Sequence, residues 1–405
     1  MMFINRALES MIKEVSNTYP ILLVTGPRQV GKTTLLKHVA DQTRKYVSLD
    51  DPVARQLAKE EPLLFLQRYE PPVIIDEIQY ALELLPYIKL HVDRKKNMGD
   101  FWLTGSQMFQ MMKGVSESLA GRVGILPMQG LSLSELNGCP NEFYTTDTKR
   151  LLNRLNLAKK MNLKEIYSRI YKGSMPAIHI TEQNVERFYA SYVDTYVQRD
   201  IRDLTQVADE MQFHRFLTAC AARTSQMVNY SELAKDVGIS SPTAKSWLSL
   251  LITSGLVVLV EPYFNNVLKR IVKAPNMYFM DTGLCAYLTR WTSSESLEVS
   301  AMSGAFFETF VVSEIIKSYL NAGKRPPVFY YRDSDQKEID LIIENDGKLQ
   351  PIEIKKSANP KKNASRHFSV LEKVGKEITE GSIICMSEDL SPLSKGVWAV
   401  PVWLI

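Results

Sequence analysis

The sequence lacks several features that would assign a protein to a class directly. Its four cysteines are far apart and show no CxxC spacing, which argues against a zinc site or a disulfide framework and favours a reducing compartment. No apolar run approaches the roughly 18 residues that span a bilayer. The charged, amphipathic N-terminus does not have the pattern of a signal peptide. We therefore expect a cytoplasmic protein with no membrane partner.

Net charge and composition give little information about partners. The formal net charge is only +4, so composition alone does not predict a nucleic-acid-binding protein, although local basic clusters could still bind one. A hydrophobic content of 45% and a charged content of 23% are ordinary for a globular protein. A chain of 405 residues is too long for one typical core, and we expect several domains.

Short apolar runs alternate with helical patterns over residues 1–140. Continuous aliphatic runs are typical of parallel strands that are buried on both faces. Their alternation with helices indicates an α/β domain with a parallel sheet. The runs are ILLVTG, KYVSLD, PVIIDE, DFWLTG and RVGILPM.

The stretch GPRQVGKTT directly follows the first apolar run. It fits GxxxxGK[ST] between a strand and a helix, which is the context that a phosphate-binding loop requires. We expect Lys32 to bridge the β- and γ-phosphates of ATP and the Thr33 hydroxyl to bind Mg²⁺. A simple glycine-rich turn is the alternative. The expected nucleotide-binding residues are Gly26, Pro27, Arg28, Gln29, Val30, Gly31, Lys32, Thr33 and Thr34.

Polar residues end two further predicted strands. We expect Asp76 to hold Mg²⁺ through water and Glu77 to act as general base, although a strand could simply end in solvated acids. Thr104 or Ser106 could sense the γ-phosphate, and we favour Ser106. Arg122 precedes the last strand. It either completes the site of an adjacent subunit or is a surface arginine.

The order GPRQVGKT, IIDEIQ, LTGSQ and SLAGR resembles the AAA-type ATPases, in particular a widespread group of prokaryotic ATP-binding proteins. The later stretches YVQRDIRDL, YFMDTGL and EIDLIIE with IEIKKS are similar to the C-terminal half of the same group, so the resemblance covers nearly the whole chain. It implies ATP hydrolysis, a homo-oligomer, and a winged-helix plus nuclease-like C-terminal region. Arg187 and Arg199 are candidates for a second sensor arginine.

After the α/β domain the pattern becomes helical. We expect a helical lid or linker over residues 141–210 and a winged-helix domain over residues 211–290. In the latter, Ser231 is expected to cap a helix that ends near Gly238. Ser241, with the proline after it, is expected to open a second helix that is followed by a β-hairpin.

The second of these helices would be the recognition helix of a DNA-binding module. It has few arginines or amides that could read base edges, so contacts to phosphates are better supported than sequence readout. Winged-helix modules also serve as lids or protein-docking units, which stays open as an alternative. The candidate contacts are Ser241, Thr243, Lys245 and Ser246 on the helix and Lys269, Arg270 and Lys273 on the wing.

Residues 300–405 are predicted to form a second, smaller α/β domain. Asp340 on one predicted strand and Glu353-x-Lys355 on the next resemble the PD-(D/E)xK nuclease core. In this interpretation Asp340 and Glu353, with Glu308 from a long helix, hold Mg²⁺, and Lys355 orients or activates water. An exposed edge strand is the alternative, and the fold can also hold DNA without cutting it. Basic residues that could follow phosphates are Lys356, Lys361, Lys362, Arg366 and His367.

The expected fold is α/β. A P-loop AAA-type ATPase domain is followed by a helical and winged-helix middle domain and a C-terminal restriction-endonuclease-like domain. The leading functional hypothesis is an oligomeric, Mg²⁺-dependent ATP hydrolase that binds and remodels DNA, including branched DNA. One alternative is an ATP-regulated, metal-dependent nuclease in defence or repair. Another is a nucleotide-dependent switch that docks proteins.

Overall fold

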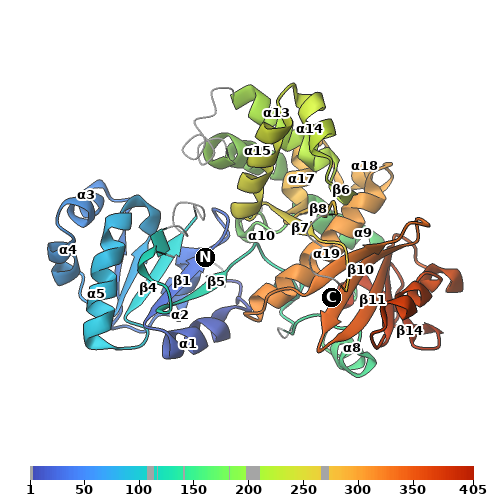
Figure 1. Cartoon of the computed structure of the whole chain (residues 1–405), viewed down its shortest axis with the longest axis horizontal. Helices are drawn as coiled ribbons and strands as arrows, with labels where there is room; N and C mark the ends of the chain where they lie inside the picture. Colours follow the sequence, from blue (N-terminus) through green and yellow to red (C-terminus); the bar gives the residue numbers. More distant parts are fainter. Residues whose placement is uncertain are drawn as a thin grey trace.

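A computed structural model of the chain describes residues 3–106, 114–115, 117–139, 142–181, 183–197, 210–265 and 273–405. Figure 1 shows an N-terminal α/β part at one end, a C-terminal sheet at the other, and a mainly helical middle part beside both. No helix within these described ranges is both long enough and apolar enough to cross a membrane.

The N-terminal part is built on a five-stranded parallel sheet with the order β2-β3-β4-β1-β5. All five strands that the apolar runs predict are present, so the prediction of a parallel α/β sheet is confirmed. The central position of β1 places the loop that follows it at the middle of the sheet's carboxyl edge. The strands are β1 (Ile21–Thr25), β2 (Lys45–Ser48), β3 (Val73–Asp76), β4 (Phe101–Gly105) and β5 (Val123–Pro127).

Helices cover both faces of this sheet because alternate residues of a strand point to opposite sides. Leu22 and Val24 of β1 pack in one hydrophobic cluster with α1 and α2, whereas Ile21 and Leu23 pack in another with α3, α4 and α5. The helices are α1 (Glu9–Thr18), α2 (Lys32–Val39), α3 (Pro52–Glu60), α4 (Pro62–Arg68) and α5 (Leu85–Lys95), with the 3₁₀ turns η1 (Ile78–Tyr80) and η2 (Leu82–Leu84).

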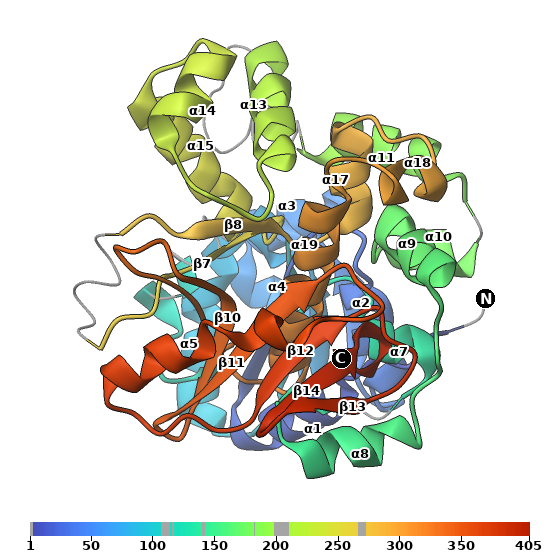
Figure 2. The same ribbon diagram turned by 90° about the vertical axis from the view of Figure 1, so that its right-hand side faces the viewer.

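Short helices lead from the N-terminal sheet to the middle part. The side chains of Ser132 and Asn162 begin two of them with capping boxes, in which Glu135 and Glu165 bond back to the cap. The helix α8 lies near the C-terminus of the chain (Figure 2). There the Arg154 side chain donates to the Leu404 carbonyl over 3.0 Å. The elements are α7 (Leu133–Asn137), α8 (Thr148–Leu155), α9 (Leu163–Lys172), α10 (Pro176–Ile180), α11 (Val185–Tyr192) and the π-helical turn η3 (Val193–Val197).

The middle part packs three helices against a three-stranded sheet with the order β6-β8-β7. Strands β7 and β8 pair antiparallel, as expected of a hairpin, and the residues between 265 and 273 lie outside the described ranges. The elements are α13 (Glu210–Ala222), β6 (Gln226–Met227), α14 (Tyr230–Val237), α15 (Ser241–Thr253), β7 (Val257–Val260) and β8 (Asn276–Phe279).

One expected helix cap is wrong. Helix α14 begins at Tyr230, so Ser231 lies inside its first turn, and the side chain of Asn229 caps it by accepting the N–H groups of Ser231 and Glu232. Asparagine is at least as good a cap as serine, so the helix can start two residues earlier than predicted. Gly238 ends α14 at a φ of 77°, as expected.

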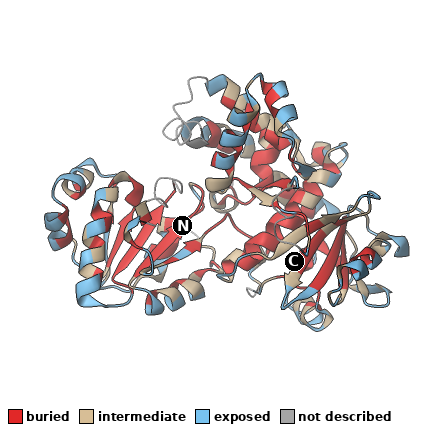
Figure 3. Cartoon of the chain, viewed as in Figure 1, coloured by how far each residue is buried: buried red, intermediate tan, exposed pale blue. Residues whose placement is uncertain are grey.

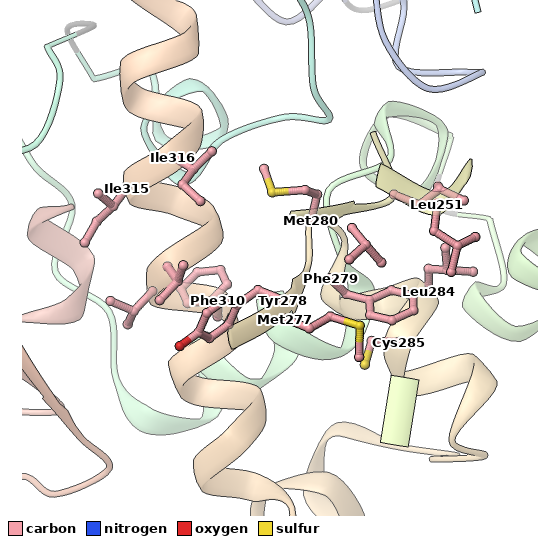
Figure 4. Close-up of a cluster of buried hydrophobic side chains, with 14 of the residues drawn as sticks. Leu251, Met277, Tyr278, Phe279, Met280, Leu284, Cys285, Phe310, Ile315 and Ile316 are labelled. Atoms are coloured by element: carbon pink, nitrogen blue, oxygen red, sulfur yellow. The ribbon is translucent and has the colours of Figure 1, made fainter. Parts of the chain in front are cut away.

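Helix α19 (Ser303–Asn321) joins the middle part to the C-terminal sheet. It is buried around most of its circumference (Figure 3), which is typical of a helix in the centre of a fold. Figure 4 shows Phe310, Ile315 and Ile316 of α19 in one apolar cluster with Tyr278 and neighbouring residues of β8. Two shorter helices pack nearby, α17 (Thr282–Leu288) and α18 (Ser294–Glu298).

The C-terminal part is a six-stranded mixed sheet with the order β13-β14-β12-β11-β10-β9. The Tyr263 N–H donates to the Tyr330 carbonyl over 2.6 Å, so the chain that leaves β7 is bonded to the first strand of this sheet. The strands are β9 (Val328–Arg332), β10 (Glu338–Asn345), β11 (Lys348–Lys355), β12 (Gly381–Cys385), β13 (Ser391–Ser394) and β14 (Val397–Pro401). The 3₁₀ turns are η4 (Lys362–Ser365), η5 (Phe368–Val374) and η6 (Val402–Leu404).

Candidate nucleotide-binding site

The loop between β1 and α2 requires its glycines. Gly26 has a φ of 142°, and a Cβ added there would lie 2.0 Å from the Met128 carbonyl oxygen. Gly31 precedes α2 with a φ of 95°, a left-handed conformation that L side chains rarely adopt. The loop therefore ends at the positive N-terminus of α2, which is a favourable position for a phosphate.

Lys32 is the first residue of α2, and its side chain turns back over the loop. Its ammonium donates to the carbonyls of Gly26 and Pro27 over 2.9 and 2.8 Å. The residue is only 6% exposed, so the charge is held close to the loop. An ammonium in this position suits the β- and γ-phosphates of a nucleotide.

Asp76 at the end of β3 gathers hydroxyl groups from three other elements. Its Oδ1 atom accepts from Thr33 over 2.7 Å and from Thr104 over 2.5 Å, and Oδ2 accepts from the Tyr46 hydroxyl over 3.2 Å. Burial and the charge of Asp76 raise the pKa of Tyr46 to about 12, so this hydroxyl stays protonated and continues to donate. The sequence predicts Thr33 and Asp76 but misses Tyr46. A carboxylate beside a hydroxyl is a fitting donor set for Mg²⁺.

Glu77, Gln79 and Ser106 form the next layer of the site. The Ser106 hydroxyl donates to the Glu77 carboxylate over 3.1 Å, and the Gln79 amide donates to the same carboxylate. The Glu77 N–H donates to Thr104 over 3.0 Å, with Glu77 in a left-handed conformation at a φ of 57°. The fold thus brings Glu77 and Ser106 together. It adds Gln79, which the sequence places in a motif but gives no role.

A cavity with a volume of about 850 Å³ lies between the phosphate loop and the middle part. Lys32, Thr33 and Glu77 line one wall, and Arg187 and Phe188 of α11 line the other. The volume lies within the range of small-molecule sites. Of the two candidate sensor arginines, Arg187 therefore reaches the cavity, whereas Arg199 lies outside the described residues.

The middle part also approaches the loop directly. At Gly255, just after α15, an added Cβ would lie 3.2 Å from Pro27. On the side of the N-terminal part, the loop residue Arg28 lies beside Tyr80 of η1, with 3.4 Å between the guanidinium and the Tyr80 hydroxyl. Groups from the middle part therefore lie against both the loop and the cavity that the loop opens into.

A buried ion pair beneath the loop is missed by sequence reasoning. The Arg6 guanidinium donates to Glu135 over 2.9 Å, to the Val30 carbonyl over 2.8 Å and to the Gln129 carbonyl over 2.7 Å. Glu135 also accepts from the N–H groups of Ala7 and Ser132. Arg6 is thus a positioning residue for the loop. The only sequence signal for its partner is the capping pattern at residues 132–135.

This network continues to α19. The Leu133 N–H donates to Glu314 over 2.7 Å, and Glu314 pairs with Lys317 over 2.9 Å. Lys317 and Glu314 are both almost fully buried. A buried pair that keeps its full set of partners holds one geometry, because loss of either partner leaves an uncompensated charge.

Arg122 does not line the cavity of its own chain. Its guanidinium bonds to both carboxylate oxygens of Asp93, at 2.6 and 3.1 Å, and to the Ala120 carbonyl. These contacts are exposed at the sheet's outer strand. A role for Arg122 in an adjacent subunit therefore stays a prediction.

The C-terminal carboxylates lie around a lysine. The Lys355 ammonium is 2.7 Å from Glu353 and 3.3 Å from Asp340, and Asp340 also accepts the Ile354 N–H over 2.7 Å. Glu308 accepts the Tyr278 hydroxyl over 2.8 Å. Burial and the charge of Asp340 raise the pKa values of Glu353 and Glu308 to about 8.

The expectation that Glu308, Asp340 and Glu353 hold a metal ion stays a prediction. Within the part of the chain that the structure describes, no three acidic, histidine or cysteine side chains are arranged to hold a metal ion. The physical reason is that the Lys355 ammonium contacts both Asp340 and Glu353 and supplies the positive charge that a metal would supply.

The predicted DNA contacts differ in their surroundings. Lys245, Lys273, Lys361, Lys362 and Arg366 are exposed, whereas Lys269 and Arg270 lie outside the described residues. Lys356 instead donates to Ser303 over 3.1 Å and to the Glu298 carbonyl, so it anchors the start of α19. The ring nitrogen of His367 lies 3.0 Å from the Glu338 carbonyl.

Comparison with known proteins agrees with the N-terminal fold and site. A family described as an AAA domain matches residues 18–137. The parallel sheet and the phosphate loop make the N-terminal part an α/β P-loop domain, and this match makes it similar to AAA domains. Two families described as domains of unknown function, DUF8612 and DUF4143, match residues 163–295 and 303–405.

The chain as a whole is similar to uncharacterized proteins of Mycobacterium tuberculosis and Mycobacterium bovis. Each is 27% identical over 405 residues, covering 99% of this chain and 84% of the relative. Among solved structures, a Walker-type ATPase of Pyrococcus abyssi is 16% identical with a TM-score of 0.45 and covers 71% of this chain and 96% of its own. The Holliday junction branch migration motor RuvB of Thermotoga maritima is 19% identical with a TM-score of 0.29, covering 62% and 85%.

Proposed function

We propose that this protein is a Mg²⁺-dependent ATP hydrolase whose nucleotide lies between the phosphate loop and α11. The cavity of about 850 Å³ carries this proposal. It is lined by Lys32, Thr33 and Glu77 of the N-terminal part, and Arg187 of the middle part lines its other wall. An AAA domain match over the loop-bearing part supports the same reaction.

Each residue has a task that its position supports. Lys32 leaves its two loop carbonyls to bind the β- and γ-phosphates, while the loop N–H groups and the α2 N-terminus hold the phosphate chain. Thr33 and Asp76 would hold Mg²⁺, which supplies charge neutralisation at the phosphates when bound. Glu77 accepts a proton from the attacking water, and Ser106 and Gln79 orient its carboxylate.

Arg187 completes the charge balance from the opposite wall. Its guanidinium makes no hydrogen bond or ion pair with any residue that the structure describes, so it is available to a γ-phosphate. Binding between the two walls would draw α11 toward the loop. Hydrolysis would release it, and the middle part would move with each turnover.

We further propose that this motion acts on DNA. The middle part has the element order of a winged helix, and Lys245 and Ser246 are exposed on α15, the helix whose end lies near Pro27. Contacts from these residues to phosphates would link DNA to the nucleotide state without reading a sequence. The C-terminal sheet, in which Asp340 on β10 and Glu353 on β11 lie beside Lys355, would hold DNA rather than cut it.

A homo-oligomer would give Arg122 a target. Its side chain is held on the exposed outer strand of the sheet by Asp93, an exposed pair that costs little to open. In an assembly of identical subunits, Arg122 would reach the nucleotide of the next subunit and stabilise negative charge in the transition state.

Phosphate release tests the proposal. Wild type is measured alone and with duplex, forked and four-way DNA, and Lys32→Ala is measured in parallel. We expect turnover in wild type, its loss in Lys32→Ala, and DNA binding in both. Turnover that survives Lys32→Ala would overturn the ATPase proposal, whereas absence of binding to all three DNA forms would overturn only the DNA part.

A further inference from the structure

A second cavity lies inside the middle part, away from the phosphate loop. Its volume is about 670 Å³, and its walls come from α9, α11, α13, α14 and α17 and from the three residues 290–292 that follow α17. None of the residues assigned above to nucleotide or DNA lines it. The volume lies in the range of sites for small organic molecules.

The lining combines aromatic faces with cationic groups. Tyr171, Tyr287 and Trp291 line the cavity, together with Arg215 of α13 and Arg290 at the end of α17. The guanidinium groups of Arg215 and Arg290 make no hydrogen bond or ion pair with any described residue. Two arginines beside three aromatic rings offer flat surfaces for stacking and paired donors for an anion.

The acidic residues of the lining do not cancel this charge. Asp236 is already paired with Arg223, which leaves Glu186 as the acid facing Arg215 and Arg290. His214 adds a further nitrogen to the same wall. The cavity therefore retains an excess of positive groups near its opening.

The backbone at Arg290, one of the lining residues, has a left-handed conformation. Arg290 has a φ of 62°, which a residue with a Cβ adopts at a cost, and the Trp291 N–H bonds back to the Ala286 carbonyl over 3.0 Å. The indole Nε1 of Trp291 is buried and has no hydrogen-bond acceptor among the described residues. A buried donor without an acceptor is costly.

We propose that this cavity binds a nucleotide unit, with the base against the aromatic residues and the phosphate against Arg215 and Arg290. The unit could be a free mononucleotide or an unpaired nucleotide of a DNA strand, since both present the same base and phosphate.

Helix α11 separates this cavity from the ATP cavity. Val185 and Glu186 line the second cavity, whereas Arg187 and Phe188 line the first. A ligand that moves α11 from one side changes the wall on the other. Occupation of the second cavity is therefore expected to change ATP affinity, and ATP is expected to change the affinity of the second ligand by the same factor.

Calorimetric titration of the full-length protein tests the site. The ATP cavity is first saturated with Mg²⁺ and a non-hydrolysable ATP analogue, and dTMP and an oligothymidylate are then titrated separately. Binding of dTMP assigns the cavity to free nucleotides, and binding of the oligothymidylate alone assigns it to a strand. If neither binds, the proposal is overturned.

Variants show whether binding occurs in this cavity. Arg215→Ala combined with Arg290→Ala should raise the dissociation constant about tenfold or more, because charge-assisted hydrogen bonds are lost. Trp291→Ala should weaken binding more than Trp291→Phe, which keeps a flat ring. Arg94→Ala, an exposed arginine on α5, should leave binding unchanged.

Two results contradict the proposal even when a ligand binds. One is wild-type affinity in the variant that lacks both arginines, provided that its circular dichroism spectrum and unfolding temperature match wild type. The other is an equal loss of affinity in Arg94→Ala, which would mean that the two arginines of the cavity have no particular part in binding. Because the second cavity does not include Lys32, the proposal can fail while ATP hydrolysis stands, and the reverse also holds.

Discussion

The two lysine–carboxylate clusters of this protein differ in what satisfies the lysine. At the phosphate loop, Lys32 is bonded to backbone carbonyls, and the nearby Asp76 accepts three hydroxyl groups of the described residues. In the C-terminal sheet, Lys355 bonds directly to the carboxylates of Asp340 and Glu353. In the first cluster the lysine and the carboxylate both bond to neutral groups, whereas in the second they bond to each other.

This difference teaches that residue types alone do not define a metal or phosphate site. Both clusters bring a lysine near two acids, and both fit a motif. Only the loop cluster also opens into a large cavity that holds an arginine from another part of the chain.

The largest difference in ATP turnover is expected between the two variants in which one lysine or the other is replaced by alanine. Lys32→Ala removes the ammonium at the phosphates and should lower ATP turnover by about 10²-fold or more. Lys355→Ala should leave turnover without DNA unchanged, because Lys355 does not line the ATP cavity. Phosphate-release kinetics measure both, and equal losses in the two variants would mean that the clusters are not independent.

The next effect concerns the network that positions the loop. Arg6→Ala leaves the buried Glu135 carboxylate without its cation and should lower the free energy of unfolding by about 3–5 kcal/mol. Lys348→Ala, which opens the exposed pair with Glu377, should cost less than about 1 kcal/mol. Denaturant unfolding provides both values, and similar losses would show that Arg6 does not anchor the loop.

Removing the lysine of the C-terminal cluster should allow its carboxylates to bind a divalent metal ion. In Lys355→Ala the carboxylates of Asp340 and Glu353 lose their shared cation, so Mn²⁺ should raise the unfolding temperature of this variant. Without nucleotide, wild type should show a smaller Mn²⁺ response and no plasmid cleavage, since the lysine competes with the metal. Cleavage by wild type that is lost in Glu353→Ala would instead support the nuclease alternative.

The smallest effect is a pH dependence near the ATP cavity. Burial lowers the pKa of His179 on α10, and the nearby charges of Arg169 and Lys172 lower it further. The Gly173 carbonyl and Asp281 act in the opposite direction without outweighing burial. The neutral ring is 3.2 Å from the Arg169 guanidinium and 2.9 Å from the Gly173 carbonyl. Below the ordinary histidine pKa of about 6.5, His179 binds a proton in the unfolded chain but not in the folded chain. The free energy of unfolding should therefore fall as the pH decreases below that value.

Unfolding in denaturant at pH 7.5 and pH 5.5 measures this effect. Wild type should lose stability between the two pH values, and His179→Gln should lose less. Arg94→Ala, at an exposed position on α5, serves as the control variant and should lose as much as wild type. An unchanged pH difference in His179→Gln would show that His179 does not contribute.

Sequence alone predicts the N-terminal strands and the loop residues because both depend on local patterns. The apolar runs fix β1 to β5, and the glycine spacing fixes the loop around Lys32. It misses Tyr46 and Arg6, because each acts through contacts with residues distant in the chain. It also misses Asn229 as a helix cap, where two good capping residues lie two positions apart and pattern alone cannot choose.

The C-terminal cluster shows a different limit. The D…ExK spacing correctly brings Asp340, Glu353 and Lys355 together, yet the spacing cannot tell whether the lysine faces water or its own carboxylates. The cavities also escape sequence reasoning, since their walls come from helices that pattern analysis treats separately.

The central claim is that ATP is hydrolysed between the loop and α11, and Arg187→Ala tests it most directly. The arginine lies on the wall opposite Lys32, outside the phosphate-loop motif, and has no structural partner among the described residues. Steady-state hydrolysis is compared with wild type and with Arg94→Ala. We predict a loss of about 10²-fold or more in kcat for Arg187→Ala alone, with an unchanged unfolding temperature. A wild-type rate in Arg187→Ala would contradict the account.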